Sequence, residues 1–262
     1  MSPIGNPQNL LIAVDSPIPD PFITFPKYLL LPTIINLIMV YLVLKIFFHK
    51  EFNIPLSDNA CDKVVRDTKM ALLAKFSLSL FLFLIAVRII SSIMGFGIIQ
   101  LWLIPIIASI PILLSGRKFT KIIKNVDWRT LIFFMAMFVL TKSIEDTQFF
   151  QSVIDNIGLH IASLPTIFSV SIISSQLLTN IPFVAFYLPL LIHTGAGIKG
   201  YMALSAASTI AGNFTLLGAA SNVIIVQNVE KRGEAITFLD FAKVGIPLTF
   251  MNAVVYYVFL SL

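Results

Sequence analysis

Charged residues are scarce in this chain, and their scarcity excludes a water-soluble globular protein. Only 12% of the 262 residues are Asp, Glu, Lys or Arg, which is about half of the share that soluble domains carry. Apolar residues make up 57% of the chain, and the mean hydropathy is +0.92. A soluble protein of this length could not bury so much apolar surface. The sequence therefore predicts an all-α, polytopic membrane protein, in which each span needs about 20 apolar residues.

Cysteine and histidine are also scarce, and their distribution excludes the common disulfide and metal sites. Cys61 is the single cysteine, so the chain can form no internal disulfide and no cysteine-based metal centre. His49, His160 and His193 lie far apart in the sequence and match no zinc-binding pattern. An intramembrane enzyme would need paired acids or a metal-ligand set at membrane depth, and the sequence has neither. We therefore expect no enzyme activity, no catalytic residue and no cofactor.

The basic residues lie mainly in loops, and they predict the orientation of the chain in the membrane. Although the net charge is +5, this distribution indicates membrane topology rather than a nucleic-acid partner. Cytoplasmic loops are enriched in Lys and Arg, so we expect a cytoplasmic loop at 50–70. The basic segments 117–129 and 231–243 are expected on the same side of the membrane. Apolar runs at 28–48 and 76–94 are long enough to span.

Residues 166–192 are predicted to form a re-entrant hairpin instead of two spans. Its apolar arms, Thr166–Leu177 and Phe183–Ile192, are separated by a polar break. An arm of 12 residues is roughly 18 Å long as a helix, too short for a hydrocarbon layer of about 30 Å. Asn180 is suited to cap the second arm, and Pro182 is suited to its first turn. We expect the tip near the bilayer centre and both ends of the hairpin outside.

A span that is interrupted in its middle follows at 201–229, and a last span covers 241–262. The first half of the interrupted span is rich in Ala and Ser, and polar breaks occur at 212–213 and 218–222. A break inside the membrane frees backbone N–H groups, which attract anions, and carbonyl groups, which can hold Na⁺. The alternative for the Ala and Ser residues is that they only allow close helix packing.

The start of the chain resembles the interrupted span, which indicates an internal repeat. Residues 2–12 (SPIGNPQNLLI) align with residues 215–225 (TLLGAASNVII), with Gly and Asn in the same places. The motif Phe-x-x-Phe-x-Lys then recurs at 22–27 and 238–243. The expected topology places the first copy outside and the second inside, as in the inverted repeats of secondary transporters. Chance recurrence of short Gly and Asn strings is the alternative.

Four strings resemble those of the ion transporter superfamily that includes arsenite permeases, divalent-anion/sodium symporters and citrate transporters. They are PIGNPQN at 3–9, VDWRTLIFFMAMFVL at 126–140, SQLLTNIPFVAFYLPLL at 175–191 and STIAGNFTLLGAASNVIIV at 208–226. The resemblance implies two inverted repeats, each with a re-entrant hairpin and a discontinuous helix, and a site where the hairpin tips meet the helix breaks.

The chain departs from this family at its beginning, because the scaffold helices and the first hairpin are missing. Residues 1–49 are expected to be a remnant of the first repeat, namely the end of its broken helix and one span. Residues 71–262 are expected to form the second repeat. The chain thus looks like an N-terminally truncated member, which a fragment, a split gene product or a misassigned start would each explain.

The resemblance also implies which residues bind substrate and ions. They lie at the second hairpin tip and at both helix breaks: Gln176, Thr179, Asn180, Pro182, Gly212, Asn213, Thr215, Gly218, Ser221, Asn222, Gly5, Asn6, Gln8 and Asn9. The side chains in this set are neutral, which suits an anionic or neutral oxyacid better than a bare cation. Because the first repeat is incomplete, we expect Asn6, Gln8 and Asn9 to face lipid.

The function expected from these features is secondary active transport of an inorganic or carboxylate anion by alternating access. Arsenite, sulfate or phosphate, and citrate or another dicarboxylate fit the neutral groups alike. We expect no resident metal; the candidate coupling ions are Na⁺, held at the broken-helix loops, and H⁺. The expected location is the cell membrane, as a multi-pass protein in contact with lipid. The alternative is a non-transporting half-protein that needs a partner, either a second copy or a complementing N-terminal half.

Overall fold

The structure is a computed structural model, and its contacts divide the chain into two units. It describes residues 2–50, 52, 68–94, 100–114, 160–230, 233 and 235–262, and isolated residues between 123 and 147. The larger unit comprises Met1–Ile54 and Ile132–Leu262, and the smaller one Pro55–Leu131. Most of the expected cytoplasmic loop 50–70 and of the basic segment 117–129 lies outside the described residues. The division of the chain into two repeats stays a prediction.

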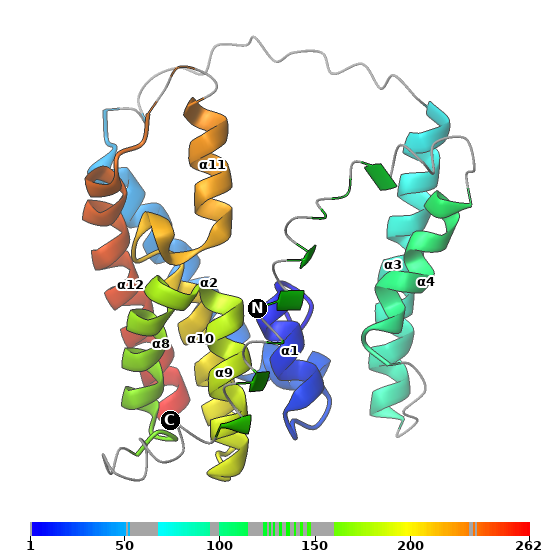
Figure 1. The fold of residues 1–262 in the computed structure, drawn as a ribbon, viewed down its shortest axis with the longest axis horizontal. Helices are drawn as coiled ribbons and strands as arrows, with labels where there is room; N and C mark the ends of the chain where they lie inside the picture. The colour runs from blue at the N-terminus through cyan, green and yellow to red at the C-terminus, as the bar shows by residue number, and fades with distance from the viewer. Residues whose placement is uncertain are drawn as a thin grey trace. The chain divides into compact units, whose positions relative to one another are not determined.

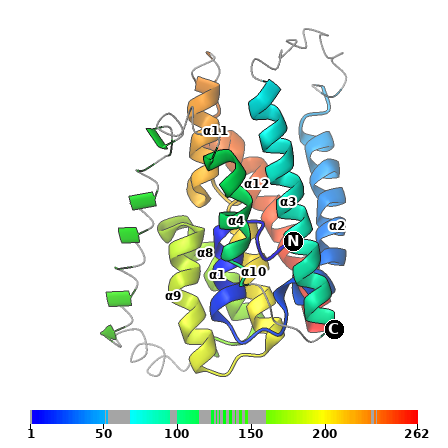
Figure 2. The same cartoon turned by 90° about the vertical axis from the view of Figure 1, so that its right-hand side faces the viewer.

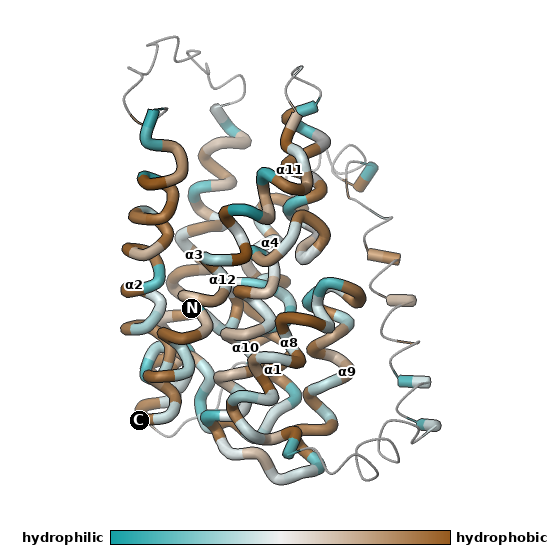
Figure 3. The backbone as a smooth tube through the Cα atoms, turned by 90° about the vertical axis from the view of Figure 1, so that its left-hand side faces the viewer, coloured by the Kyte–Doolittle hydropathy of each residue, from teal (hydrophilic) through white to brown (hydrophobic). Residues whose placement is uncertain are grey.

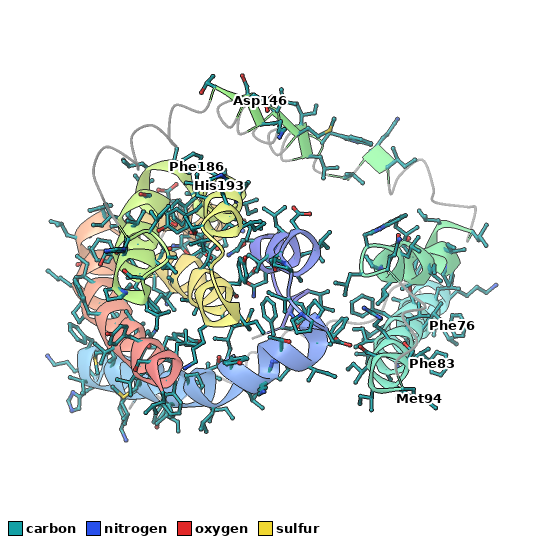
Figure 4. The ribbon with its side chains drawn as sticks, turned by 90° about the horizontal axis from the view of Figure 1, so that it is seen from below. Phe76, Phe83, Met94, Asp146, Phe186 and His193 are labelled. Atoms are coloured by element: carbon teal, nitrogen blue, oxygen red, sulfur yellow. The ribbon has the colours of Figure 1, made fainter. Side chains whose placement is uncertain are left out.

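The smaller unit holds two helices that pack on each other, α3 (Thr68–Ile93) and α4 (Leu103–Leu113). The Ser77 hydroxyl of α3 donates a hydrogen bond to a carbonyl oxygen of α4. Helix α3 is long and apolar enough to cross a membrane, as the apolar run at 76–94 predicts. Its side chains Phe76 and Phe83, and Met94 directly after its end, are exposed (Figure 4), which a helix surrounded by lipid can tolerate.

The larger unit contains the elements that carry the predicted site (Figures 1 and 2). They are α1 (Pro7–Asp15), α2 (Pro21–Phe47), α8 (Leu164–Leu178), α9 (Asn180–His193), α10 (Ile198–Ala211), the 3₁₀ turn η2 (Leu216–Gly218), α11 (Ala220–Glu230) and α12 (Phe238–Ser261). Within the described part of the chain every regular element is a helix. Together with the apolar spans, this makes the protein an all-α membrane protein.

Among the described residues of the larger unit, helices α2 and α12 are long and apolar enough to cross a membrane, and they run antiparallel beside each other (Figures 1 and 2). Large apolar side chains cover their outer faces, among them Leu31, Leu37 and Phe250, each more than half exposed. Apolar residues predominate along α2 in Figure 3, with a few polar turns between them. Water would not tolerate so large an apolar face, so these faces meet lipid.

Local sequence explains where these helices begin. Asn6 precedes Pro7, and its side-chain oxygen accepts a 2.8 Å hydrogen bond from the Asn9 backbone N–H. Asp20 precedes Pro21 and caps α2 in the same manner through the Phe22 N–H. An acceptor side chain followed by proline is a strong start signal because proline needs no hydrogen bond in the first turn.

The predicted hairpin is present as two short helices, α8 and α9, that pack on each other. With 15 and 14 residues they are about 22 and 21 Å long, too short to span. The expected cap at Asn180 is wrong: Thr179 makes the turn with a φ of +60°, and Asn180 is already the first residue of α9. The left-handed Thr179 reverses the chain within one residue, so no separate capping residue is left.

Helix α10 lies at the centre of the larger unit and packs on α8, α9, α12, α1 and α2. Its small residues Ala203, Ser205, Ala206, Ala207 and Ser208 are completely buried. Small side chains let the neighbouring helices approach closely, so the packing explanation holds for this stretch. The elements around the end of α10 form the candidate site.

Candidate substrate and ion site at the helix break

The predicted interruption of the helical segment 201–229 is present. Helix α10 ends at Ala211, the short turn η2 follows, and α11 starts at Ala220 (Figure 1). Gly212 and Asn213 lie at the first predicted break, and Gly218 and Asn222 flank the second. The two predicted breaks are thus the two ends of one interruption, 212–219, and Ser221 and Asn222 already belong to the first turn of α11.

Three helices fix the carbonyl groups at the end of α10. The last carbonyls of a helix lack intrahelical partners. Here Gln176 Nε2 of α8 donates to the Ala211 carbonyl oxygen at 2.9 Å, and Asn222 Nδ2 of α11 donates to that of Gly212 at 2.7 Å. Thr249 Oγ1 of α12 donates to the Ile210 carbonyl oxygen at 3.5 Å. The break is thus held in one shape from three sides.

Gln176 is the residue that ties the hairpin to the break. Besides its bond to Ala211, its side-chain oxygen accepts a 2.7 Å hydrogen bond from the Thr215 hydroxyl. Gly218 packs against the same groups: a Cβ atom built on it would lie 2.7 Å from the Ala211 carbonyl oxygen and 2.8 Å from Gln176 Oε1. Only glycine fits there.

Asn180 brings an unused acceptor to the break. It is 9% exposed, and its Nδ2 would lie 3.4 Å from a Cβ atom built on Gly212. Its Oδ1 atom is buried and has no hydrogen-bond partner among the described residues. Leaving a buried acceptor unpaired costs about 1–3 kcal/mol, so this oxygen is suited to a ligand that carries a positive charge or a hydrogen-bond donor.

Two buried serines of α8 were missed by the sequence reasoning. Ser171 and Ser175 are completely buried, and their hydroxyl groups have no hydrogen-bond partner within the described part. They lie four residues apart on the arm that leads to Thr179, so both occupy one face of the helix. That spacing was visible in the sequence, but without α10 in place it did not distinguish a buried face from a lipid-facing one.

The residues of the first break pack on α10, and the expectation that they face lipid is wrong. Asn9 is 1% exposed and accepts a 2.8 Å hydrogen bond from the Ser205 hydroxyl. Asn6 Nδ2 donates to Thr209 Oγ1 at 3.2 Å, and Gln8 is buried. The Ser and Thr side chains of α10 supply the polar partners that lipid lacks.

The other predicted residues have different positions. Pro182 is buried in the first turn of α9, whereas Ser221 is exposed at the start of α11. Asn213 approaches α12 through its backbone: a Cβ atom built on Gly245 would lie 2.0 Å from the Asn213 carbonyl oxygen. Gly5 is exposed beside the cap of α1. The assignment of all these residues to substrate or ions stays a prediction.

Helix ends with opposite partial charges meet at the break. The carboxyl end of α10 carries partial negative charge, and the amino ends of α9 and α11 carry partial positive charge. The described residues contain no cluster of three His, Cys, Asp or Glu side chains that could hold a metal ion. Neutral amides, hydroxyls and backbone groups therefore provide the chemistry, and they can accommodate an anion at one helix end and a monovalent cation at the other.

Comparison with known families gives an independent result. The family model described as "Citrate transporter" matches residues 1–201, which include the first break, the hairpin and the start of α10. No solved structure matches the chain.

Curated relatives include proteins with transporter names. The chain is 32% identical over 168 residues to "Uncharacterized transporter slr0753" of Synechocystis, with 54% of this chain and 37% of the relative covered. It is 33% identical over 153 residues to "Putative transporter arsB" of Dictyostelium discoideum, covering 55% of this chain and 27% of the relative. It is 30% identical over 161 residues to mouse "P protein", covering 55% and 19%. The aligned part thus spans about a fifth to a third of each of these relatives.

Proposed function

The chain belongs to the citrate transporter family, and from this premise we propose that it takes part in secondary active transport of an anion. The substrate class is an inorganic or carboxylate anion, for which arsenite, sulfate or phosphate, and citrate or another dicarboxylate are the candidates. The protein resides in the cell membrane as a multi-pass protein and works without catalysis. Names of relatives that refer to transporters support the same proposal.

The observation that carries the proposal is the meeting of the hairpin tip with the fixed helix break. The amide N–H groups of Gln176 and Asn222 are donated to carbonyl oxygens and hold the break in one shape, and Asn180 brings its amide to the same turn. The amino ends of α9 and α11 and the Asn180 amide offer N–H groups, which bind carboxylate or oxyanion oxygens without a fixed positive charge. An anion bound in this way can leave again, as transport requires.

Na⁺ is the proposed coupling ion at the end of α10, with H⁺ as the alternative. The unpaired Asn180 Oδ1 and the carbonyl oxygens of the break are the kind of neutral ligands that discontinuous helices offer to Na⁺. Coupling follows if the ion stabilises the geometry in which the anion is bound. In alternating access, this loaded geometry opens to one side of the membrane at a time.

Uptake into liposomes tests the proposal directly. The purified chain is reconstituted, a Na⁺ or pH gradient is imposed, and radiolabelled citrate, sulfate and arsenite are offered in turn. Saturable, gradient-driven uptake of one of these anions is the expected result for a transport-competent protein. A longer member of the family in parallel liposomes serves as the positive control.

The second candidate, a half-protein that acts only with a partner chain, predicts a different outcome. It is favoured by the length of the relatives, of which this chain aligns with 19–37%. In that case the longer relative transports and this chain alone does not, although it binds the same anion in a calorimetric titration. Neither uptake nor binding of any of the three anions would contradict both candidates.

A further inference from the structure

Arg88 places a permanent positive charge inside the apolar span α3. Its side chain forms no hydrogen bond or ion pair with any described residue, and its Nε atom is buried without a partner. No Asp or Glu occurs between Asp67 and Asp127, so neither α3 nor α4 carries a counter-ion. An unpaired charge at membrane depth is costly, and this arginine therefore requires an anionic partner from elsewhere.

Arg88 lies on the buried face of α3, but helix α4, which packs on this face, does not extend to it. Ser77 and Ser91 are the buried residues of α3, and the Ser77 hydroxyl donates to the Ala108 carbonyl oxygen of α4. Arg88 follows Ser77 by 11 residues, about three helical turns, so both side chains leave the helix in nearly the same direction. Helix α4 continues for five residues on either side of Ala108, about 8 Å, whereas Arg88 lies about 16 Å along α3 from Ser77.

The spacing of two basic residues of α3 places Arg88 near the edge of the hydrocarbon layer. Lys75 and Arg88 are 13 residues apart, about 20 Å along the helix, and the layer is about 30 Å thick. When the layer is centred between these two charges, each lies about 5 Å inside its edge. From that depth a lysine or arginine side chain brings its charge to the lipid headgroups. The buried Nε fits this arrangement, because the apolar stem is enclosed while the two Nη atoms remain accessible.

The surroundings of Arg88 favour a lipid over a dissolved anion. Large apolar side chains at the same end of α3, those of Ile90, Ile93 and Met94, are more than half exposed. A dissolved anion would have to leave water to reach a charge among them, whereas a phospholipid brings a phosphate and its acyl chains together. A guanidinium group binds phosphate through two parallel hydrogen bonds. Because zwitterionic lipids carry an ammonium group beside the phosphate, an anionic phospholipid is the better partner.

We propose that Arg88 binds the phosphate group of an anionic phospholipid at the Ile93 end of α3. The acyl chains of this lipid lie along the same face of α3, past Leu84, which is partly exposed and one turn closer to the middle of the helix. The lipid supplies the counter-charge that α3 and α4 lack, and it fixes the depth of α3 in the bilayer. This proposal rests on the membrane location of the chain and not on the transport function proposed above.

Fluorescence quenching by brominated lipids measures which lipid lies beside a chosen residue. The full chain, with Trp102 and Trp128 replaced by Phe, receives the substitution Leu84→Trp. It is reconstituted in vesicles that mix dioleoylphosphatidylcholine with dioleoylphosphatidylglycerol, and one lipid at a time is replaced by its dibrominated form. The two quenching curves give the affinity of phosphatidylglycerol relative to phosphatidylcholine at position 84.

The matched control is Leu82→Trp, because Leu82 is exposed on another face of the same helix. At position 84 phosphatidylglycerol should be preferred roughly fivefold or more, which corresponds to about 1 kcal/mol for one basic residue near anionic lipid. At position 82 the two lipids should quench alike. Arg88→Gln should abolish the preference at position 84, whereas Lys75→Gln, which removes another positive charge of α3, should leave it unchanged.

An equal preference at the two positions, or a preference that survives Arg88→Gln, would overturn the proposal. The comparison of positions 84 and 82 retains Arg88, so it decides the matter if the Arg88→Gln variant does not fold. Absence of any preference at both positions would also overturn the proposal and would point to an acidic protein side chain as the partner.

Inorganic phosphate distinguishes a lipid headgroup from a free anion at the same charge. Added to the mixed vesicles, it should lower the preference at position 84 no more than sodium chloride of equal ionic strength does. A larger decrease would assign Arg88 to free phosphate and would overturn the lipid site. Anion uptake is measured separately, so either result leaves the proposed transport function standing or falling on its own test.

Discussion

At the scale of single residues, the helix break depends on glycines, which leave room for neighbouring backbone, as much as on its polar side chains. Gly218 and Gly245 lie where a Cβ atom would collide with a carbonyl oxygen. The sequence pointed to Gly218 because it interrupts an apolar run. It offered no reason to select Gly245, because a glycine inside a span is ordinary and its role arises only from the approach of Asn213.

Gly218→Ala should destabilise the protein, because the added methyl group has no room at the helix break. The added methyl group would lie 2.7 Å from the Ala211 carbonyl oxygen and 2.8 Å from Gln176 Oε1, and such overpacking destabilises by about 1–3 kcal/mol. Thermal unfolding in detergent should show the loss. Gly197→Ala is the matched control, since nothing lies within 4 Å of its added Cβ atom. Equal unfolding temperatures for the two variants would contradict the close packing of the break.

Asn180→Ala should weaken ligand binding while leaving the fold intact. Its Oδ1 has no hydrogen-bond partner in the described part of the chain, so its removal breaks no bond to that oxygen. A bound ligand that uses the amide would lose about 1–3 kcal/mol of binding free energy. Calorimetric titration with the transported anion and with Na⁺ measures the loss. Thr194→Ala, at the far end of the same helix, should bind as the wild type does, and unchanged binding by Asn180→Ala would remove Asn180 from the site.

At the scale of helices, length and polarity made most of the architecture predictable. The hairpin arms were recognised because each is too short to span, and the broken helix because glycine and asparagine interrupt apolar sequence. The docking of α1 on α10 was not predictable in this way. Asn9 and Ser205 are 196 residues apart. Nothing in the local sequence indicates that side chains of α10 form hydrogen bonds with the first break in addition to allowing close helix packing.

The hairpin should have both ends on the outer side of the membrane. His160→Cys and His193→Cys, each made in the Cys61→Ser background, replace exposed residues just before α8 and at the end of α9. Both cysteines should react with an impermeant reagent added outside right-side-out vesicles. Lys243→Cys, at the start of α12, should react only after the vesicles are opened. Labelling of one hairpin end alone would mean that the hairpin crosses the membrane.

At the scale of the whole molecule, the composition predicted the membrane, and the repeat predicted that two of the long helices are equivalent. The scarcity of charge and the apolar runs sufficed for the fold class, because a continuous apolar run of about 20 residues crosses lipid as a helix, which satisfies its own backbone groups. The repeat motif of 22–27 and 238–243 indicated that α2 and α12 are equivalent. That the Asn36 side chain donates a hydrogen bond to the Asn252 carbonyl oxygen was beyond the sequence, because equivalence does not say that two elements touch.

The lengths of α2 and α12 make bilayer thickness a variable in the behaviour of this protein. With 27 and 24 residues, these helices are about 40 and 36 Å long, and the hydrocarbon layer is about 30 Å thick. Helices longer than the layer tilt to keep their apolar faces in lipid. Thinner membranes of short-chain lipids demand a larger tilt than thick, sterol-rich ones. Since α2 and α12 pack on each other, a change of tilt alters the angle at which they cross, so the thickness of the host membrane acts directly on the packing of these two helices.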